Sequence, residues 1–267
     1  MAEPMMYVVT GFFGAFGGGL FYWGFNRMQK FRLINDTPTS KIRSMAMGIV
    51  EIHGNVQAGT ILKTPFSQSD CVYYKYEIQE YRKHTSRDSK GHTRTYYSWD
   101  TVGSGERRVG FYAKDETGNV WVDPNRAEVN IPLKKVFLQK AGIFGAFNVI
   151  LGALKNFDSG QRMDISRWNL QPLDPKKQFT FATVGDRKYL EYYIEPDENL
   201  YLMGTAADDN GTVLIRKGEN EPTFIISTKS EKELLKSIRW QMIAGFGLGI
   251  LFIVIVTFLI LNIIGMI

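Results

Sequence analysis

The chain has 267 residues, of which 44% are hydrophobic, and its 32 basic and 27 acidic residues give a formal net charge of +5. That length suits one or two domains. A single cysteine, Cys71, excludes an intramolecular disulfide and a zinc site made from several cysteines of one chain. The average composition is that of a soluble protein, but the apolar residues are concentrated at the two ends.

Two uncharged runs occupy the ends of the chain. Residues 5–25 and residues 240–267 contain no Asp, Glu, Lys or Arg. Since about 20 apolar residues cross the bilayer core as a helix, we predict two transmembrane helices, the first over residues 5–25. A buried core helix fits poorly, because both runs are long and are bounded by basic residues. A cleaved signal peptide is disfavoured because the basic residues follow the first run instead of preceding it.

The distribution of basic residues predicts an orientation in the membrane. All 32 Lys and Arg residues lie between Arg27 and Arg239. The positive-inside rule therefore places the segment between the spans in the cytoplasm and both termini outside, in a multi-pass protein of the cell membrane. Much of this charge lies beside the predicted spans, which favours the lipid bilayer over nucleic acid as a partner. The residues predicted to lie at the membrane interface are Tyr22, Trp23, Arg27, Arg239 and Trp240.

The segment between the spans is predicted to hold a polar linker, residues 26–45, followed by a β-rich domain, residues 46–228. The fold class is thus two terminal transmembrane α-helices flanking a mainly antiparallel β (α+β) soluble domain. A barrel is one arrangement that such strands can form. Turns are predicted at 53–55 and 114–118, and a polar loop at 83–94. The predicted strands are 46–52, 71–81, 96–101, 108–113, 119–122, 178–184, 188–195, 199–205, 212–216 and 223–227.

One uncharged segment interrupts the strands. Residues 141–154 are too few for a comfortable third span, but they form an amphipathic helix pattern. Such a helix can pack on the core of the domain itself, or it can lie in the inner membrane surface with Phe144, Phe147 and Leu151 as its contacts. A re-entrant or spanning segment is a third possibility, and the sequence leaves the choice open.

A second helix start is predicted at the end of the domain. Ser230 and Glu233 have the spacing of a capping box. The helix that begins there should continue through residues 229–265 into the second span, which would couple the domain rigidly to that span.

The glycines of the two spans predict a helix contact. Gly14 and Gly18 are four residues apart in the first span, and so are Gly245 and Gly249 in the second. Small residues at this spacing let membrane helices approach closely. Gly18 and Gly249 would both lie about 10–14 Å below the cytoplasmic surface. We therefore expect the spans to pack on each other, or on a second copy of the chain as a homo-oligomer.

The sequence predicts no catalytic residue, no cofactor and no metal site. His84 and His92 lie in the predicted polar loop without metal-ligand spacing, and His53 has no carboxylate or cysteine at ligand spacing. Neither a Walker A loop nor a His-Glu-x-x-His motif is present, and the sequence around Ser104 lacks the pattern of a nucleophile elbow.

Several separate blocks resemble the GIDE, or "beside a membrane", family, in the same order. They are NDTPTSKIRSMAMGIVEIHG at 35–54, LKTPFSQSDCVYYKYEIQEY at 62–81, FYAKDETGNVWVDP at 111–124, YYIEPDENLYLMGTA at 192–206 and FIISTKSEKELLKSIRW at 224–240. The resemblance covers roughly residues 34–240, and the flanking spans also match the layout of the family.

The resemblance also implies an activity that the residues do not support. The best-known members are RING-type ubiquitin ligases of the mitochondrial outer membrane, whose RING finger follows the second span and needs Cys and His ligands for two zinc ions. This sequence has no such ligands, as in the prokaryotic relatives that lack the RING finger. The mitochondrial members face the intermembrane space, which implies the opposite orientation to the one that the charges predict.

We therefore expect a non-catalytic, membrane-anchored interaction or scaffold module with an unidentified protein partner. The alternative is a component of a ubiquitin-ligase-like or membrane-remodelling system in which another protein supplies catalysis. A membrane hydrolase is disfavoured because no catalytic constellation is found.

Overall fold

A computed structural model describes residues 4–88, 91–141, 146–155, 168–175, 182–219, 221 and 223–264. The chain forms two compact units. One is helical and combines Met1–Thr39 with Lys229–Ile267, and the other is β-rich and comprises Ser40–Thr228. Each is described by itself.

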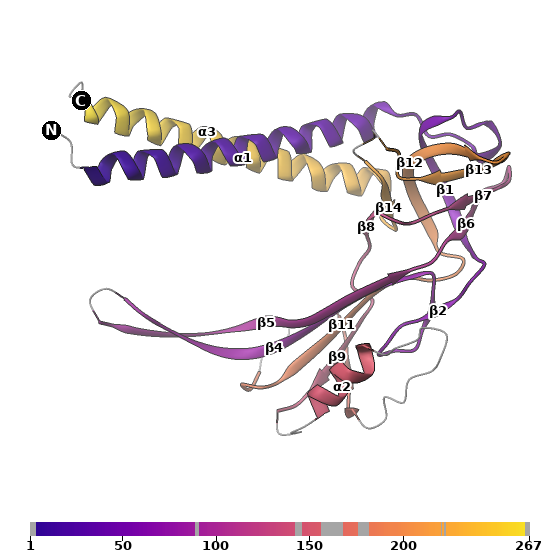
Figure 1. Ribbon diagram of the computed structural model, residues 1–267, viewed down its shortest axis with the longest axis horizontal. Helices are drawn as coiled ribbons and strands as arrows, with labels where there is room; N and C mark the ends of the chain where they lie inside the picture. Colours follow the sequence, from indigo (N-terminus) through magenta and orange to yellow (C-terminus); the bar gives the residue numbers. More distant parts are fainter. Residues whose placement is uncertain are drawn as a thin grey trace. The chain divides into compact units, whose positions relative to one another are not determined.

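The helical unit consists of two long apolar helices, α1 (Pro4–Asp36) and α3 (Glu231–Ile263), which lie side by side (Figure 1). Each has 33 residues and is long and apolar enough to cross a membrane. Helix α1 continues past the predicted end of the span at Phe25, so the first part of the predicted linker is helical. Residues 26–36 are rich in good helix formers, and the first proline after them is Pro38.

Helix α3 begins where the capping pattern places it. Ser230 has extended backbone angles, and its side chain accepts a hydrogen bond from the backbone N–H of Glu233 at 3.4 Å. Two acidic residues in the first turn, Glu231 and Glu233, stabilise the positive end of the helix dipole.

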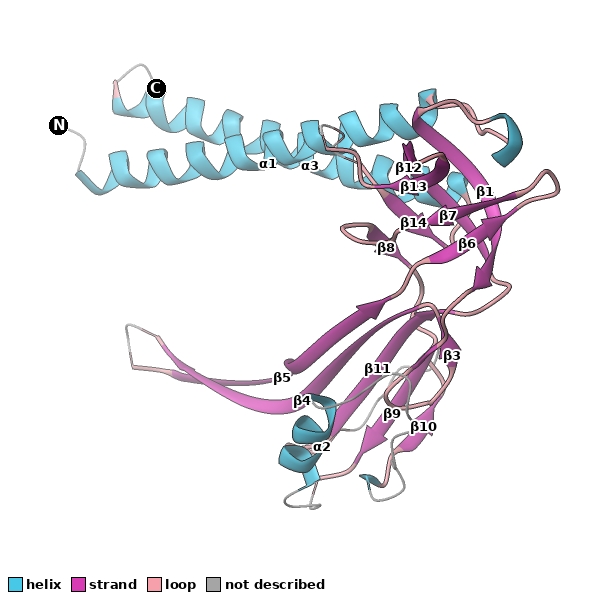
Figure 2. Ribbon diagram, turned by 45° about the vertical axis from the view of Figure 1, so that its right-hand side comes forward, coloured by secondary structure: helices cyan, strands magenta, loops and turns pink. Residues whose placement is uncertain are grey.

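A small closed barrel forms one part of the β-rich unit (Figure 2). Its strand order is β1-β6-β7-β13-β12, and β12 pairs again with β1. All of these pairings are antiparallel except that between β7 and β13, as in a five-stranded Greek-key barrel of the OB type. Two short strands, β14 and β8, extend the sheet from β12. The strands are β1 (Gly48–Ala58), β6 (Phe111–Lys114), β7 (Asn119–Val122), β8 (Glu128–Asn130), β12 (Asn199–Asp209), β13 (Thr212–Arg216) and β14 (Ile225–Ser227).

Alternate residues of the barrel strands fill its core. Val50, Ile52 and Val56 of β1 are buried with Phe111, Leu202 and other apolar residues. The predicted turn at 53–55 is wrong, because β1 runs straight through it from Gly48 to Ala58. At Gly54 an added Cβ would lie 3.1 Å from the carbonyl oxygen of Lys114, so this glycine permits close approach of two strands and does not form a turn.

Two insertions between barrel strands build a second sheet. Its strand order is β10-β9-β11-β4-β5, and all of its pairings are antiparallel. The insertion between β1 and β6 supplies β4 and β5, and the insertion between β7 and β12 supplies the other three strands. A short pair, β2 and β3, precedes β4. The strands are β2 (Leu62–Lys63), β3 (Asp70–Cys71), β4 (Tyr73–Arg87), β5 (Thr93–Arg108), β9 (Lys135–Gln139), β10 (Gln171–Leu173) and β11 (Arg187–Ile194).

Helix α2 (Ala146–Lys155) packs on this second sheet. Ile150 is fully buried in a cluster with Phe66, Ile78 and Tyr189, which favours the first reading of the 141–154 segment, a helix on the core of its own domain. Of the residues proposed for a membrane contact, Phe144 lies outside the described residues. The same holds for the side chains of Phe147 and Leu151.

The predicted loop at 83–94 is for the most part a β-hairpin. β4 continues to Arg87 and β5 begins at Thr93, and the two pair residue by residue up to this turn. These strand ends are rich in charged and hydroxyl side chains, a composition that in sequence is typical of a solvated loop. The strands predicted at 119–122 and 212–216 are confirmed with the same bounds. Most of the strand predicted at 178–184 lies outside the described residues.

A buried carboxylate ties a loop to the second sheet. Glu191 of β11 is completely buried, and it accepts hydrogen bonds from the backbone N–H of Phe66 at 2.6 Å and of Ser67 at 3.1 Å. Burial raises the pKa of this carboxyl group, although these hydrogen bonds act in the opposite direction. The contact places Phe66 in the apolar cluster under α2.

Candidate functional site

The contact between α1 and α3 is close at glycines. An added Cβ at Gly245 would lie 2.8 Å from the Cα of Gly24, and one at Gly249 would lie 3.1 Å from the backbone nitrogen of Phe21. In α1, an added Cβ at Gly17 would lie 2.8 Å from the Cβ of Phe252. Aromatic rings flank these positions: Phe16 contacts Phe252, and Phe21 contacts Phe246, each with ring centroids 5.1 Å apart.

The structure brings together only half of the predicted glycine set. Gly245 and Gly249 are buried in the contact. Gly14 and Gly18 are exposed, and an added Cβ at either would meet no atom within 4 Å. Their place is taken by Gly17 and Gly24. The four-residue spacing is correct for a helix face, but in a glycine-rich span it does not determine which face is used.

The aromatic and basic residues predicted for the interface lie in the part of the helix pair around Gly24 and Gly245. Trp23 contacts the position of Gly245, and the guanidinium of Arg27 lies 5.4 Å from the centroid of the Trp23 ring. Tyr22 is 67% exposed and Trp240 is 65% exposed, as expected for side chains that face a lipid interface. Arg239 precedes Trp240 in α3 and is also exposed.

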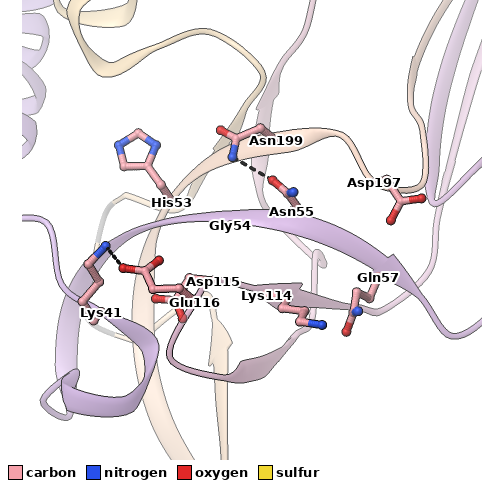
Figure 3. Close-up of a pocket in the computed structure, with 10 residues that line it drawn as sticks. All are labelled: Lys41, His53, Gly54, Asn55, Gln57, Lys114, Asp115, Glu116, Asp197 and Asn199. Carbon is pink, nitrogen blue, oxygen red and sulfur yellow. Dashed lines mark hydrogen bonds and ion pairs between the residues drawn. The ribbon is translucent and has the colours of Figure 1, made fainter.

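A polar pocket of about 470 Å³ lies on the barrel (Figure 3). β1 contributes residues 53–55 and Gln57, and the end of β6 with the turn after it contributes residues 114–116. Lys41, Asp197 and Asn199 complete the lining. The side-chain amide of Asn199 donates to the Oδ1 atom of Asn55 at 2.8 Å, and Lys41 pairs with Glu116. The sequence did not single out this pocket, because it assigned His53 and Asn55 to a turn.

One carboxylate of the pocket serves to hold the turn. Oδ1 of Asp115 accepts the backbone N–H of Thr117 at 2.7 Å and of Gly118 at 3.0 Å, and Oδ2 accepts the backbone N–H of Ile42 at 2.9 Å. Burial tends to raise the pKa of Asp115, but these hydrogen bonds outweigh it and hold the pKa below its usual value. This side chain therefore joins the barrel turn to the segment that precedes β1.

We expect Asp115→Ala to lower the stability of the β-rich unit by about 1–3 kcal/mol, because it leaves several backbone donors without an acceptor. Glu116→Ala is the matched control, since its exposed pair with Lys41 contributes little. The pKa of Asp115 is lowered on folding, so its contribution is present above the unfolded pKa of about 3.9 and is lost as pH falls through the folded value. Thermal unfolding at pH 7 and below pH 4 measures both effects. Equal losses for the two variants at pH 7 would contradict the assignment.

The geometry of the pocket suits recognition of a polar group. It offers amides, an imidazole, the ammonium group of Lys114 and the carboxylate of Asp197. Asp115 is held by backbone N–H groups, and Glu116 and Lys41 pair with each other. The three histidines do not meet: His84 pairs with Asp100 at 2.8 Å, His92 with Asp88 at 3.2 Å, and the ring of His53 packs against Tyr201. Among the described residues, no group of three or more His, Cys, Asp or Glu side chains could hold a metal ion.

Comparison with known proteins gives a match to a protein family. The sequence model of the GIDE family, described as E3 ubiquitin ligase, matches residues 79–259, which is about two thirds of the chain. The match runs from β4 to the last turns of α3, and it contains the blocks at 111–124, 192–206 and 224–240. No curated protein and no solved structure matches the chain.

Proposed function

The chain belongs to the GIDE family, and we propose that it is a membrane-anchored interaction module. In this proposal α1 and α3 cross the bilayer as a pair, and the β-rich unit binds a protein partner at the membrane surface. The observation that carries the proposal is the glycine contact between two apolar helices, each 33 residues long. Paired spans of this kind hold a domain at the membrane without the need for any chemistry of their own.

Anchoring is tested by extraction. An integral protein stays in the membrane pellet after washing with alkaline carbonate and is released only by detergent. Release of the full chain by carbonate alone would contradict the proposal, because a surface-bound protein behaves in that way.

The orientation that we propose is a cytoplasmic β-rich unit, as the positive-inside rule predicts. Thr212 is exposed at the start of β13, and Thr212→Cys places a thiol there, while the native Cys71 is buried. We expect a membrane-impermeant maleimide to leave Thr212→Cys unlabelled in intact cells and to label it after permeabilisation. Labelling in intact cells would place the unit on the outer side, as in the mitochondrial relatives.

A second candidate function rests on the description of the family as E3 ubiquitin ligase. The chain could serve a conjugation system as its membrane subunit, with another protein supplying transfer. Purification of the full chain from native membranes, followed by mass spectrometry, distinguishes the two. Reproducible recovery of a conjugating or ligase subunit with the wild-type chain would favour this second function. We expect a pocket variant such as Lys114→Glu to lose that subunit during a high-salt wash.

A further inference from the structure

The β4–β5 hairpin extends beyond its sheet as a two-stranded ribbon (Figures 1 and 2). β11 pairs with β4 only as far as Glu80, whereas β4 and β5 remain paired to Arg87 and Thr93. The ribbon comprises residues 81–87 and 93–99, and at its base the backbone of Tyr81 still bonds to Gly185 and Asp186. An isolated two-stranded hairpin is at best marginally stable in water. A surface that covers one side of it would supply the missing stabilisation.

The two faces of the hairpin differ in charge at the base of the ribbon, where Glu80 and Asp100 lie on one face only. Side chains alternate between the faces of a strand, and the pairing of Tyr81 with Trp99 sets the register. One face, which we call the basic aromatic face, has no carboxylate. It consists of Tyr81, Lys83, Thr85, Arg87, Thr93, Thr95, Tyr97 and Trp99. The opposite face of the ribbon carries Arg82, His84 and Arg94, and two carboxylates lie on this side just below the ribbon. There Glu80 pairs with Arg82, and Asp100 pairs with His84.

Ring contacts fix the aromatic residues of this face. Tyr81 stacks on Tyr97 with centroids 5.9 Å apart and contacts Trp99 at 5.2 Å. The ammonium group of Lys188, from the neighbouring strand β11, lies 4.0 Å from the centroid of the Trp99 ring. Tyr97 is 50% exposed. Its cross-strand partner Lys83 is also exposed, and so is Arg87, four residues further along β4. The face thus presents ordered aromatic rings and cations together.

We propose that the basic aromatic face binds an anionic lipid surface. Tyr and Trp rings with one apolar and one polar end favour the level of the headgroups, and Lys and Arg bind anionic headgroups there. Each basic residue near such a surface strengthens binding about fivefold. The inference rests on the proposed membrane anchoring, which keeps the chain close to lipid. Single-stranded nucleic acid also binds cations and stacked rings, and it is an outcome of the test below.

Two neighbouring residues provide a matched pair of probes. Thr85 lies on the basic aromatic face and Ser86 on the opposite face, and both are exposed. The full chain carrying Thr85→Cys or Ser86→Cys is labelled with an environment-sensitive dye and reconstituted in vesicles. Burial raises the pKa of the native Cys71 thiol to about 12, so it does not compete for the label.

We expect a blue shift for the dye at position 85 in vesicles with phosphatidylglycerol and none in pure phosphatidylcholine, whereas the dye at position 86 stays aqueous in both. Lys83→Glu combined with Arg87→Glu should abolish most of the shift, as should a rise from about 0.1 M to 1 M salt. Arg94→Glu, on the opposite face, is the control and should leave it unchanged.

Three outcomes would overturn the inference. They are an equal shift at both positions, a shift that does not depend on anionic lipid, and a shift produced by a single-stranded oligonucleotide but not by anionic vesicles. Flotation of the chain with both kinds of vesicle reports anchoring separately. Failure of the ribbon to bind lipid is therefore distinguishable from failure of the proposed function.

Discussion

Replacing Gly245 with leucine is expected to separate α1 from α3, whereas the same change at Gly247 is expected to leave them together. The Cβ of residue 245 would lie 2.8 Å from the Cα of Gly24 and 2.9 Å from the Trp23 ring, so the backbones must move apart. At Gly247 the added Cβ meets no atom within 4 Å. Overpacking of this kind costs about 1–3 kcal/mol even where side chains can adjust.

Helix α1 offers a second matched pair. Gly17→Leu would place a Cβ 2.8 Å from that of Phe252, and Gly18→Leu would meet nothing. Disulfide cross-linking of Phe21→Cys with Phe246→Cys, whose native rings are 5.1 Å apart, reports the contact in membranes. We expect cross-linking to fall at least severalfold for the changes at 17 and 245 and to persist for those at 18 and 247. Equal loss in all four variants would show that bulk in the span matters and the contact does not.

Replacing Glu191 with alanine is expected to destabilise the β-rich unit by about 2–5 kcal/mol. The change leaves the buried N–H groups of Phe66 and Ser67 without their acceptor and opens a cavity beside them. Glu191→Gln retains one acceptor oxygen and should cost less. Glu77→Ala, which removes a partly exposed pair with Lys75, should change stability by less than about 1 kcal/mol.

The single buried cysteine supplies the measurement for Glu191. Cys71 is fully buried, so a thiol-reactive dye labels it only when the β-rich unit opens, and the labelling temperature follows the stability of that unit. The pH dependence also has a definite sign. Because folding raises the pKa of Glu191, its contribution is fullest below the unfolded pKa of about 4.3 and is lost as pH rises through the folded value. Wild-type stability should therefore fall relative to Glu191→Gln as pH rises, and a rise instead would contradict the assignment.

The sequence predicts well those features that depend on local pattern. Uncharged length reveals both terminal helices, and the Ser230 cap marks the start of α3. Sequence-based prediction fails where long-range packing determines the local structure. His53, Gly54 and Asn55 have turn propensities, but β1 is held straight by pairing with both β12 and β6. The polar ends of β4 and β5 are not recognisable as strands from sequence alone, because strand propensity depends on the cross-strand partners.

The candidate sites show the same division. Spacing alone identified Gly245 and Gly249, but only the packing distinguishes Gly17 from Gly18. The polar pocket is lined by residues that are far apart in the chain, from Lys41 to Asn199. No local motif reveals such an assembly. The basic aromatic face is also not evident from the sequence. Lys83 and Arg82 are neighbours in the chain, and they are assigned to opposite faces only when the segment is known to be a strand.

The closed barrel also constrains the order of folding. Glu51 of β1 bonds to Tyr201 of β12, 150 residues further along the chain, at 2.8 Å. At a synthesis rate of about 5–20 residues per second, β1 is made roughly 8–30 s before this partner strand. Meanwhile β4 and β5, joined by a short turn, can pair at once, since nearby contacts close with little loss of entropy. We therefore expect the inserted hairpin to form before the barrel that surrounds it in the sequence, and the open edge of β1 to be the point at which newly made chains are most prone to aggregate.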